Sequence, residues 1–189
     1  MDPSVSRGTR GLSQLFPAGH LPRYSSLKVI TLVIGGKKMS IVEKPAALAE
    51  LVRVKARRDT VDLDYLRAAR AAAENASQRE IARILALSQP AVNKILARAK
   101  GIADLRPTFH GATPFEIAQR YSGGFIDRAQ VIDELARWPY LPKPKADEFD
   151  DVWEPGEGTW YDVEEALQQG LIDGEIYEAA QLRRHAGKQ

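Results

Sequence analysis

The sequence predicts an all-helical protein in which a small helical bundle is followed by a module of two repeated helical hairpins. Three observations predict this class. From Lys44 onward the chain is dominated by alanine, leucine and charged residues, which are good helix formers. Residues 77–96 contain two serine-capped helix starts. Residues 113–127 and 159–173 align without gaps as an internal repeat.

Composition excludes several classes of protein. The chain has 189 residues, of which 44% are hydrophobic and 28% charged, as in a globular cytoplasmic protein. Without cysteine there can be no disulfide, cysteine-ligated zinc or thiol catalysis, and three histidines offer little for a metal site. The longest apolar run, 29–34, is far shorter than a membrane-spanning helix. We therefore expect no enzyme activity, metal, cofactor or membrane partner.

Charge divides the chain into two functional halves. Residues 1–100 hold 18 Lys and Arg against 8 Asp and Glu, a net +10, and residues 101–189 hold 9 against 17, a net −8. A basic half suits nucleic acid, whereas an acidic half repels phosphate. The acidic half is therefore expected to have a different role, such as binding a basic protein partner.

Residues 1–43 form a separate leader that we expect to be disordered or non-native. The segment is rich in glycine, proline and serine and contains one strand-like stretch, 27–34, before a Gly-Gly turn. The Gly-Gly-Lys-Lys that precedes Met39 can be a translated purine-rich ribosome-binding sequence. This pattern predicts Met39 as the natural start.

The basic domain, 44–101, is predicted to begin with two helices. The first has Pro45 in its opening turn and ends near Arg58. The second starts near Asp59 or Thr60 and ends near Asn75.

Two further short helices follow, joined by a tight turn. Ser77 and Glu80 form a capping box for the first of them. Ser88 caps the second, 89–100, with Pro90 in its first turn. The apolar side chains expected to face inward are Ile81, Ala82, Ile84, Leu85, Leu87, Val92, Ile95 and Leu96.

Residues 77–100 resemble the helix-turn-helix of bacterial and phage transcriptional regulators. The small Ala82, the aliphatic Leu87 and the Ser88 cap stand where that family has such residues. Ala86 departs from it, because the family has glycine at this turn position, where φ is often positive. A helix hairpin can also be pure scaffold, but the two caps, the apolar pattern and the basic charge together favour double-stranded DNA as the partner.

The resemblance implies that the second motif helix enters the major groove of DNA. Its base-contacting residues would be Gln89, Pro90, Asn93 and Lys94. Phosphate contacts would come from the helix starts and from the far end of the second helix, at Ser77, Gln78, Arg79, Ser88, Arg98 and Lys100. No winged hairpin pattern follows Lys100.

After a linker, 102–112, the acidic module 113–189 contains the repeat. Threonine is expected to cap the first helix of each copy and aspartate the second, with a glycine between the two helices. A proline-rich acidic loop, 139–158, separates the copies. Its carboxylates interleave with aromatic residues that could bind a basic partner protein: Phe149, Trp153, Trp160 and Tyr161.

These observations predict a sequence-specific DNA-binding regulator, most simply a repressor of the antitoxin or phage-repressor kind, which could act as a homodimer. The alternative is an adaptor or antitoxin whose acidic half binds a protein, with DNA contact secondary. A hydrolase that uses the acidic loop is disfavoured, because the loop has no histidine and calcium-loop spacing fails.

Overall fold

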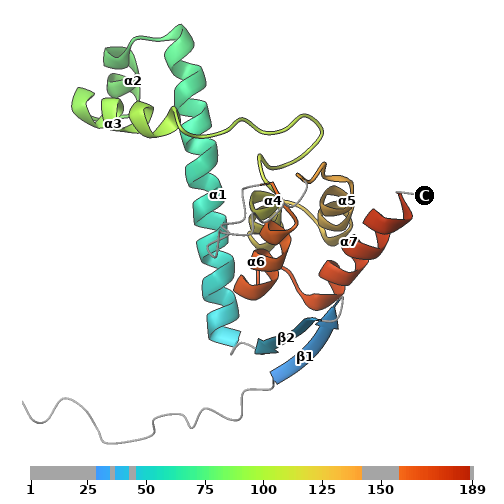
Figure 1. Ribbon diagram of the computed structural model, residues 1–189. Helices are drawn as coiled ribbons and strands as arrows, with labels where there is room; N and C mark the ends of the chain where they lie inside the picture. Colours follow the sequence, from blue (N-terminus) through green and yellow to red (C-terminus); the bar gives the residue numbers. More distant parts are fainter. Residues whose placement is uncertain (1–28, 35–36, 43–45, 142–157, 188–189) are drawn as a thin grey trace, which may run out of the picture.

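The computed structural model describes residues 29–34, 37–42, 46–141 and 158–187. The described residues contain seven helices, and the all-helical class predicted from the sequence is confirmed from Ala46 onward. Before them, β1 (Val29–Ile34) and β2 (Lys37–Val42) pair antiparallel, with Leu32 opposite Met39. The strand-like stretch predicted at 27–34 thus contains β1 (Figure 1). The rest of the predicted leader, 1–28, lies outside the described residues.

The first helix, α1 (Ala46–Asn75), is a single helix of 30 residues, so the prediction of two helices with a break near Thr60 was wrong. Thr60 is fully buried, and its hydroxyl donates to the carbonyl oxygen of Ala56 at 2.8 Å. It therefore bonds back along the helix instead of capping a new one. Because no glycine or proline interrupts α1, the helix runs straight past this point for about 45 Å in all.

Two short helices pack against the C-terminal part of α1. They are α2 (Gln78–Ile84) and α3 (Gln89–Ala99), and we call residues 66–101 the head. Ile81, Ala82 and Val92 form its small core. The guanidinium of Arg70 on α1 donates to the carbonyl oxygens of Ala99, at 3.1 Å, and Ile102, at 2.6 Å. The head is therefore anchored where α3 ends.

The main core lies in a four-helix unit beside the other half of α1 (Figure 1). We call this unit, residues 109–141 and 158–187, the module. Its helices are α4 (Pro114–Ser122), α5 (Arg128–Arg137), α6 (Tyr161–Gln169) and α7 (Gly174–Ala186). The densest packing joins α5 to α7 and α4 to α6, so equivalent helices of the two repeat copies contact each other. Each copy buries its apolar face against the other.

Most of the local geometry recurs in both copies. Gly124 and Gly170 have φ of +80° and +72°, which favours glycine after a helix. Asp127 accepts a hydrogen bond from the Gln130 amide at 2.8 Å, and Asp173 caps α7 in the same way. These glycines and aspartates act as the sequence predicts.

The threonine cap is present in only one of the two copies. Thr113 caps α4 by accepting from the amide of Glu116 at 3.1 Å, but the predicted cap by Thr159 was wrong. The helix start shifts to Trp160, and the Thr159 hydroxyl is buried without a hydrogen-bond partner. The carboxylate of Asp162 instead accepts from the backbone of Gly158, at 3.0 Å. The helix therefore begins without a side-chain cap.

A buried ionic network joins α1 to α4. The guanidinium of Arg67 donates to both oxygens of Glu116, at 2.7 and 2.8 Å, and Arg120 bridges Glu116 to Asp64. Next to this network, a Cβ on Gly123 would meet the Cα of Arg57 at 3.0 Å, so α1 and α4 lie in close contact. The helix α1 therefore packs against the module as well as carrying the head.

The segment predicted as a linker, 102–112, is held at both ends. The guanidinium of Arg67 donates to the Ala103 carbonyl at 2.9 Å. Phe109 packs edge-on against Trp138 with ring centroids 4.8 Å apart. Head and module are thus connected through α1 and through this anchored segment.

Candidate nucleic-acid interface

The turn between α2 and α3 is tight and contains one residue with a positive φ. Ala86 adopts a φ of +53°, the conformation for which glycine is favoured. The amide of Leu87 donates to the carbonyl of Ala82 at 2.9 Å, which closes the turn. Ser77 and Ser88 each accept from the backbone amide three residues on, at 3.3 Å. These bonds fix the angle at which α3 leaves the turn.

The outer face of α3 presents the predicted base-contacting side chains to solvent. Gln89, Pro90, Asn93 and Lys94 are all exposed. Val92, on the opposite face, is 1% exposed and packs in the core of the head. The structure therefore brings the four residues together on one accessible helix face.

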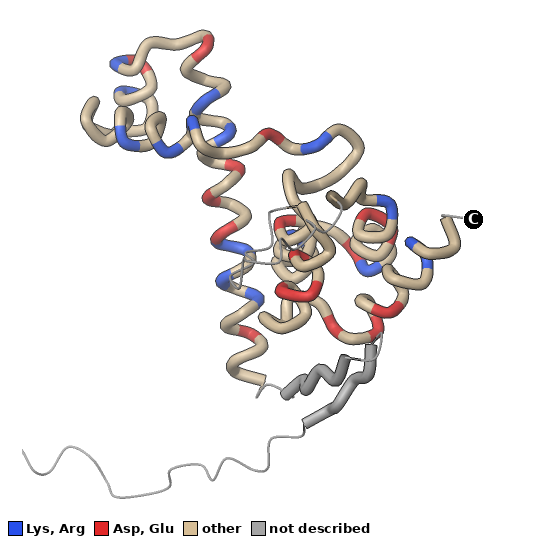
Figure 2. The backbone as a smooth tube through the Cα atoms, in the orientation of Figure 1, with Lys and Arg blue, Asp and Glu red and all other residues tan. Residues whose placement is uncertain are grey.

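Unpaired cations surround this face. Between Ser77 and Lys100 the chain carries five Lys and Arg side chains and one Glu (Figure 2). None of these five cations forms an ion pair with any residue that the structure describes, unlike Arg67 and Arg120 in the ionic network. Unpaired surface cations are free to contact phosphate without first losing a protein partner.

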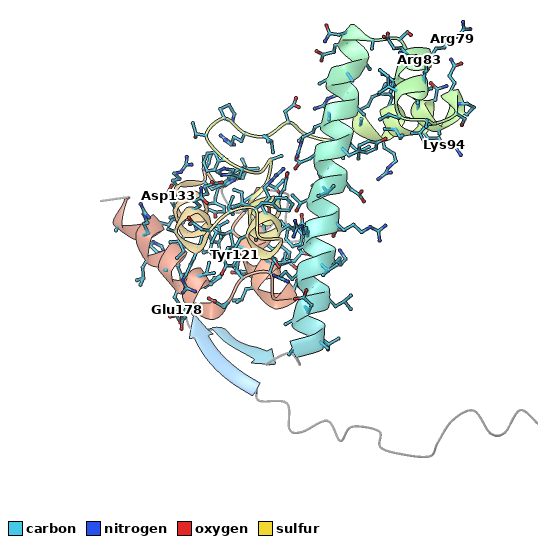
Figure 3. The ribbon with its side chains drawn as sticks, turned by 180° about the vertical axis from the view of Figure 1, so that it is seen from behind. Arg79, Arg83, Lys94, Tyr121, Asp133 and Glu178 are labelled. Carbon is cyan, nitrogen blue, oxygen red and sulfur yellow. The ribbon has the colours of Figure 1, made fainter. Side chains whose placement is uncertain are left out.

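The cations on α2 include one that sequence reasoning missed. Arg83 is exposed and follows the predicted phosphate contact Arg79 by one helical turn, and Figure 3 shows both on the head together with Lys94. The spacing of four residues, which places two side chains on one helix face, is the signal that could have found it.

Arg98 has different surroundings from the other predicted phosphate contacts. It lines an open pocket of about 470 Å³ together with Asp59 and Asp62 of α1. Carboxylates so near would repel a phosphate group. Gln78, Arg79 and Lys100, which are exposed elsewhere on the head, are better placed for the phosphate backbone.

Three apolar side chains that we predicted to face inward are exposed. Ile84 is 65%, Leu85 41% and Leu87 39% exposed, so the prediction of a buried plug in the turn was wrong. Ile81 and Ala82 already fill the contact between α2 and α3. No described element covers the opposite side of α2, which leaves this apolar surface in contact with solvent.

The predicted protein-binding residues fall into three groups. Phe149 and Trp153 lie outside the described residues. Trp160 is committed to the fold, because its indole N–H donates to the hydroxyl of Tyr177 at 2.8 Å and its ring packs against Tyr140. Tyr161 remains 38% exposed and available to a partner.

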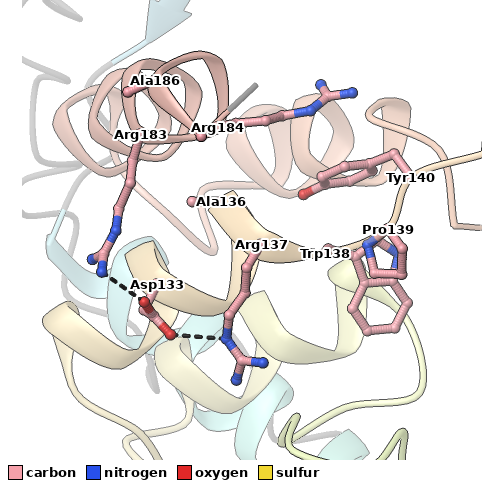
Figure 4. Close-up of a pocket in the computed structure, with 10 residues that line it drawn as sticks. Asp133, Ala136, Arg137, Trp138, Pro139, Tyr140, Arg183, Arg184 and Ala186 are labelled. Atoms are coloured by element: carbon pink, nitrogen blue, oxygen red, sulfur yellow. Dashed lines mark hydrogen bonds and ion pairs between the residues drawn. The ribbon is translucent and has the colours of Figure 1, made fainter. Parts of the chain in front are cut away.

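A second surface feature lies between α5 and α7 (Figure 4). It is an open pocket of about 810 Å³ in which Arg137 and Arg183 both pair with Asp133, each at 2.8 Å. Arg184 lies 4.4 Å from the ring centroid of Tyr140. The aspartate and the aromatic ring hold all three guanidiniums, so this pocket is stabilised from within the fold.

Other kinds of site find little support among the described residues. No group of three or more His, Cys, Asp or Glu side chains could hold a metal ion there. The helices of that part of the chain are also too short or too polar to cross a bilayer. The acidic loop 142–157, on which the hydrolase alternative depends, lies outside the described residues.

Comparison with known proteins adds no relative. No protein-family model matches the chain, and no curated protein or solved structure matches it with significance.

Proposed function

We propose that this protein is a sequence-specific DNA-binding regulator that inserts α3 into the major groove and represses transcription. One observation carries the proposal: Gln89, Pro90, Asn93 and Lys94 share one exposed face of a capped helix, in a head whose exposed cations form no ion pair with any described residue. An outward helix of this kind, following a tight turn, is the arrangement that reads base edges in the major groove.

Each of these side chains suits a different base edge. The amides of Gln89 and Asn93 can each form two hydrogen bonds with adenine. The ammonium of Lys94 can donate to O6 and N7 of guanine, and the ring of Pro90 can contact a thymine methyl group. Together they offer discrimination at several neighbouring base pairs.

The phosphate contacts would orient α3 without selecting a sequence. Arg79 and Arg83 are exposed on α2, and Lys100 lies at the far end of α3. The hydroxyls of Ser77 and Ser88 accept backbone amides and keep their own protons to donate to phosphate. Repression is the simplest consequence, because a protein seated on a promoter excludes polymerase.

The direct test is selection of binding sites from random duplexes with the full chain. We expect a defined consensus that is bound at least ~10³-fold more tightly than unrelated duplex at the same salt concentration. Enrichment of no sequence, with equal affinity for all duplexes, would rule out sequence-specific reading by α3.

A second candidate is a protein-binding role for the acidic half. The net charge of −8 over residues 101–189, the exposed Tyr161 and the 72% exposed Leu182 favour it. Deletion of 139–189 cannot test it, because Ile176 and Tyr177 belong to the main core. The surface variants Tyr161→Ala and Leu182→Ala are expected to keep the fold, because both side chains are exposed. Loss of a co-purifying protein in these variants, with DNA affinity unchanged, would support this role.

A further inference from the structure

An exposed apolar stripe runs along α1. Leu51, Val54, Val61 and Tyr65 are 63%, 54%, 49% and 38% exposed. Leu51 and Tyr65 occupy the first position of a heptad repeat, and Val54 and Val61 occupy the fourth. Arg58 occupies the one first position between them. The stripe faces away from α4, because Ala56 and Thr60, which pack toward the module, are buried on the other side of α1.

We propose that a second copy of this chain docks on this stripe, so that the two α1 helices pair antiparallel. Side chains with this periodicity form the seam of a two-helix contact in which each row fills the gaps of the other. On an isolated helix the same apolar surface would remain in water.

Charge along α1 identifies the partner and its direction. Residues 53–58 carry four cations, Arg53, Lys55, Arg57 and Arg58, and the next segment carries three anions, Asp59, Asp62 and Asp64 (Figure 2). In a parallel pair like charges would meet, and Arg58 would face its own copy. In an antiparallel pair centred between residues 59 and 60, the basic segment of each copy faces the acidic segment of the other.

The antiparallel register also gives each stripe residue a suitable neighbour. Val54 faces Tyr65 of the second copy, and Arg58 lies beside Val61 of the second copy with its guanidinium free to reach out of the seam. Lys55 and Asp62 of the second copy do not stand directly opposite each other, but both flank the seam on the same side. Their side chains are exposed, at 70% and 55%, and each also has a partner of opposite charge on its own helix, Asp59 for Lys55 and Arg58 for Asp62.

The same pairing would arrange the two heads for one DNA duplex, a step that depends on the proposed function. Leu66 and Ala69, which are buried on the side of α1 that carries α3, point about 100° and about 40° around the helix from Tyr65, both in the same direction. The two-fold axis of an antiparallel pair is perpendicular to the plane that contains both helices. A helix packed on one side of that plane in one copy therefore lies on the same side in the other copy. Both copies of α3 would therefore lie on the same face.

The spacing of the two heads fits DNA as well. The part of α1 that carries α3 lies roughly ten residues from the centre of the pairing, or about 15 Å along the helix. The two α3 helices would thus be about 30 Å apart, close to the ~34 Å between successive major grooves on one side of a duplex. The preferred site would then contain two inverted half-sites one helical turn apart.

The association is tested with the full chain and without DNA, by sedimentation equilibrium over a concentration series. We expect a dimer whose dissociation constant rises at least tenfold in Val61→Asp. The matched control is Leu182→Asp, which charges an even more exposed apolar residue on α7 and should leave the dimer unchanged. A wild-type chain that stays monomeric up to ~1 mM, or a dimer that Val61→Asp leaves intact, would overturn the inference.

The direction of pairing is tested by cysteine cross-linking, since the chain has no cysteine of its own. The single variants Val54→Cys and Tyr65→Cys are mixed and oxidised. Antiparallel pairing predicts the mixed disulfide between them, and a Val54→Cys homodimer would show parallel pairing and overturn the inference.

A charge exchange gives an independent check. Lys55→Glu and Asp62→Lys should each weaken the dimer, and the double variant should restore it. These measurements also separate the two proposals. A dimer without DNA affinity would leave the inference standing and reject the proposed function, whereas a monomer that binds its consensus DNA would do the reverse.

Discussion

The carboxylate of Glu116 on α4 accepts two hydrogen bonds from the guanidinium of Arg67 on α1, at 2.7 and 2.8 Å, across 49 positions of sequence. Glu116 is 4% exposed and also accepts from the Ala112 amide and from Arg120. This ion pair fixes α1, the helix that carries the head, to the module, and we call it the joint.

Glu116→Gln is expected to destabilise the fold by about 3 kcal/mol, because the guanidiniums of Arg67 and Arg120 lose their buried anion and keep only the half-exposed Asp64. Urea unfolding of the full chain measures the effect. The matched control is Glu50→Gln, which removes an exposed partner of Arg53 and should leave the free energy of unfolding nearly unchanged. Equal effects of the two variants would contradict the role of the joint.

The same joint makes stability depend on pH. Burial by itself raises the pKa of Glu116, but the hydrogen bonds from Arg67, Ala112 and Arg120 outweigh burial and hold the pKa below its ordinary 4.5. A carboxylate with a lowered pKa contributes stability above its unfolded pKa, and that contribution is lost as the pH falls through the folded pKa. We expect the urea concentration at the unfolding midpoint to decrease as the pH is lowered below about 4.5. This decrease should be less steep in Glu116→Gln.

Ala86→Gly is expected to stabilise the protein by about 1 kcal/mol, because glycine adopts the φ of +53° without the strain of a Cβ. Thermal unfolding measures the change. Ala97→Gly, an exposed position inside α3, serves as the control and should destabilise by ~1 kcal/mol. If both glycines lower the melting temperature alike, the turn does not have the strained geometry seen here.

The two repeat threonines should respond oppositely to the same substitution. Thr113→Val removes the cap of α4 and should cost ~1 kcal/mol. Thr159→Val replaces a buried hydroxyl that lacks a partner with a methyl group of the same shape, so it should be neutral or stabilising. Chemical denaturation of both variants under identical conditions compares them directly. A larger loss at Thr159 would mean that its hydroxyl is bonded after all.

Lys94→Ala should weaken binding to the selected consensus by about 1–3 kcal/mol and affect unrelated duplex less. Arg79→Ala should weaken both duplexes alike and reduce the salt dependence of binding by about one counterion. Fluorescence anisotropy titrations at several salt concentrations measure both quantities. Arg128→Ala, which removes the same charge from the start of α5 in the module, is the control and should leave both affinities unchanged.

Much of the head and of the repeat could be predicted from the sequence because the signals are local. Four helices begin at a capping side chain that accepts a hydrogen bond from an amide only three residues away: Ser77, Ser88, Asp127 and Asp173. Each helix start is therefore determined by the few residues around it. The outward face of α3 follows from the helical period once Val92 is assigned to the core.

Tertiary packing decided the remainder. Whether Thr60 ends a helix or bonds back along it depends on the burial of its side chain in the folded chain. Whether Ile84 is buried depends on a neighbour that the described chain does not supply. The partner of Arg67 lies 49 positions away, beyond the reach of any local pattern. A sequence specifies which groups need a partner, but only the folded chain determines which partner is within a few ångströms.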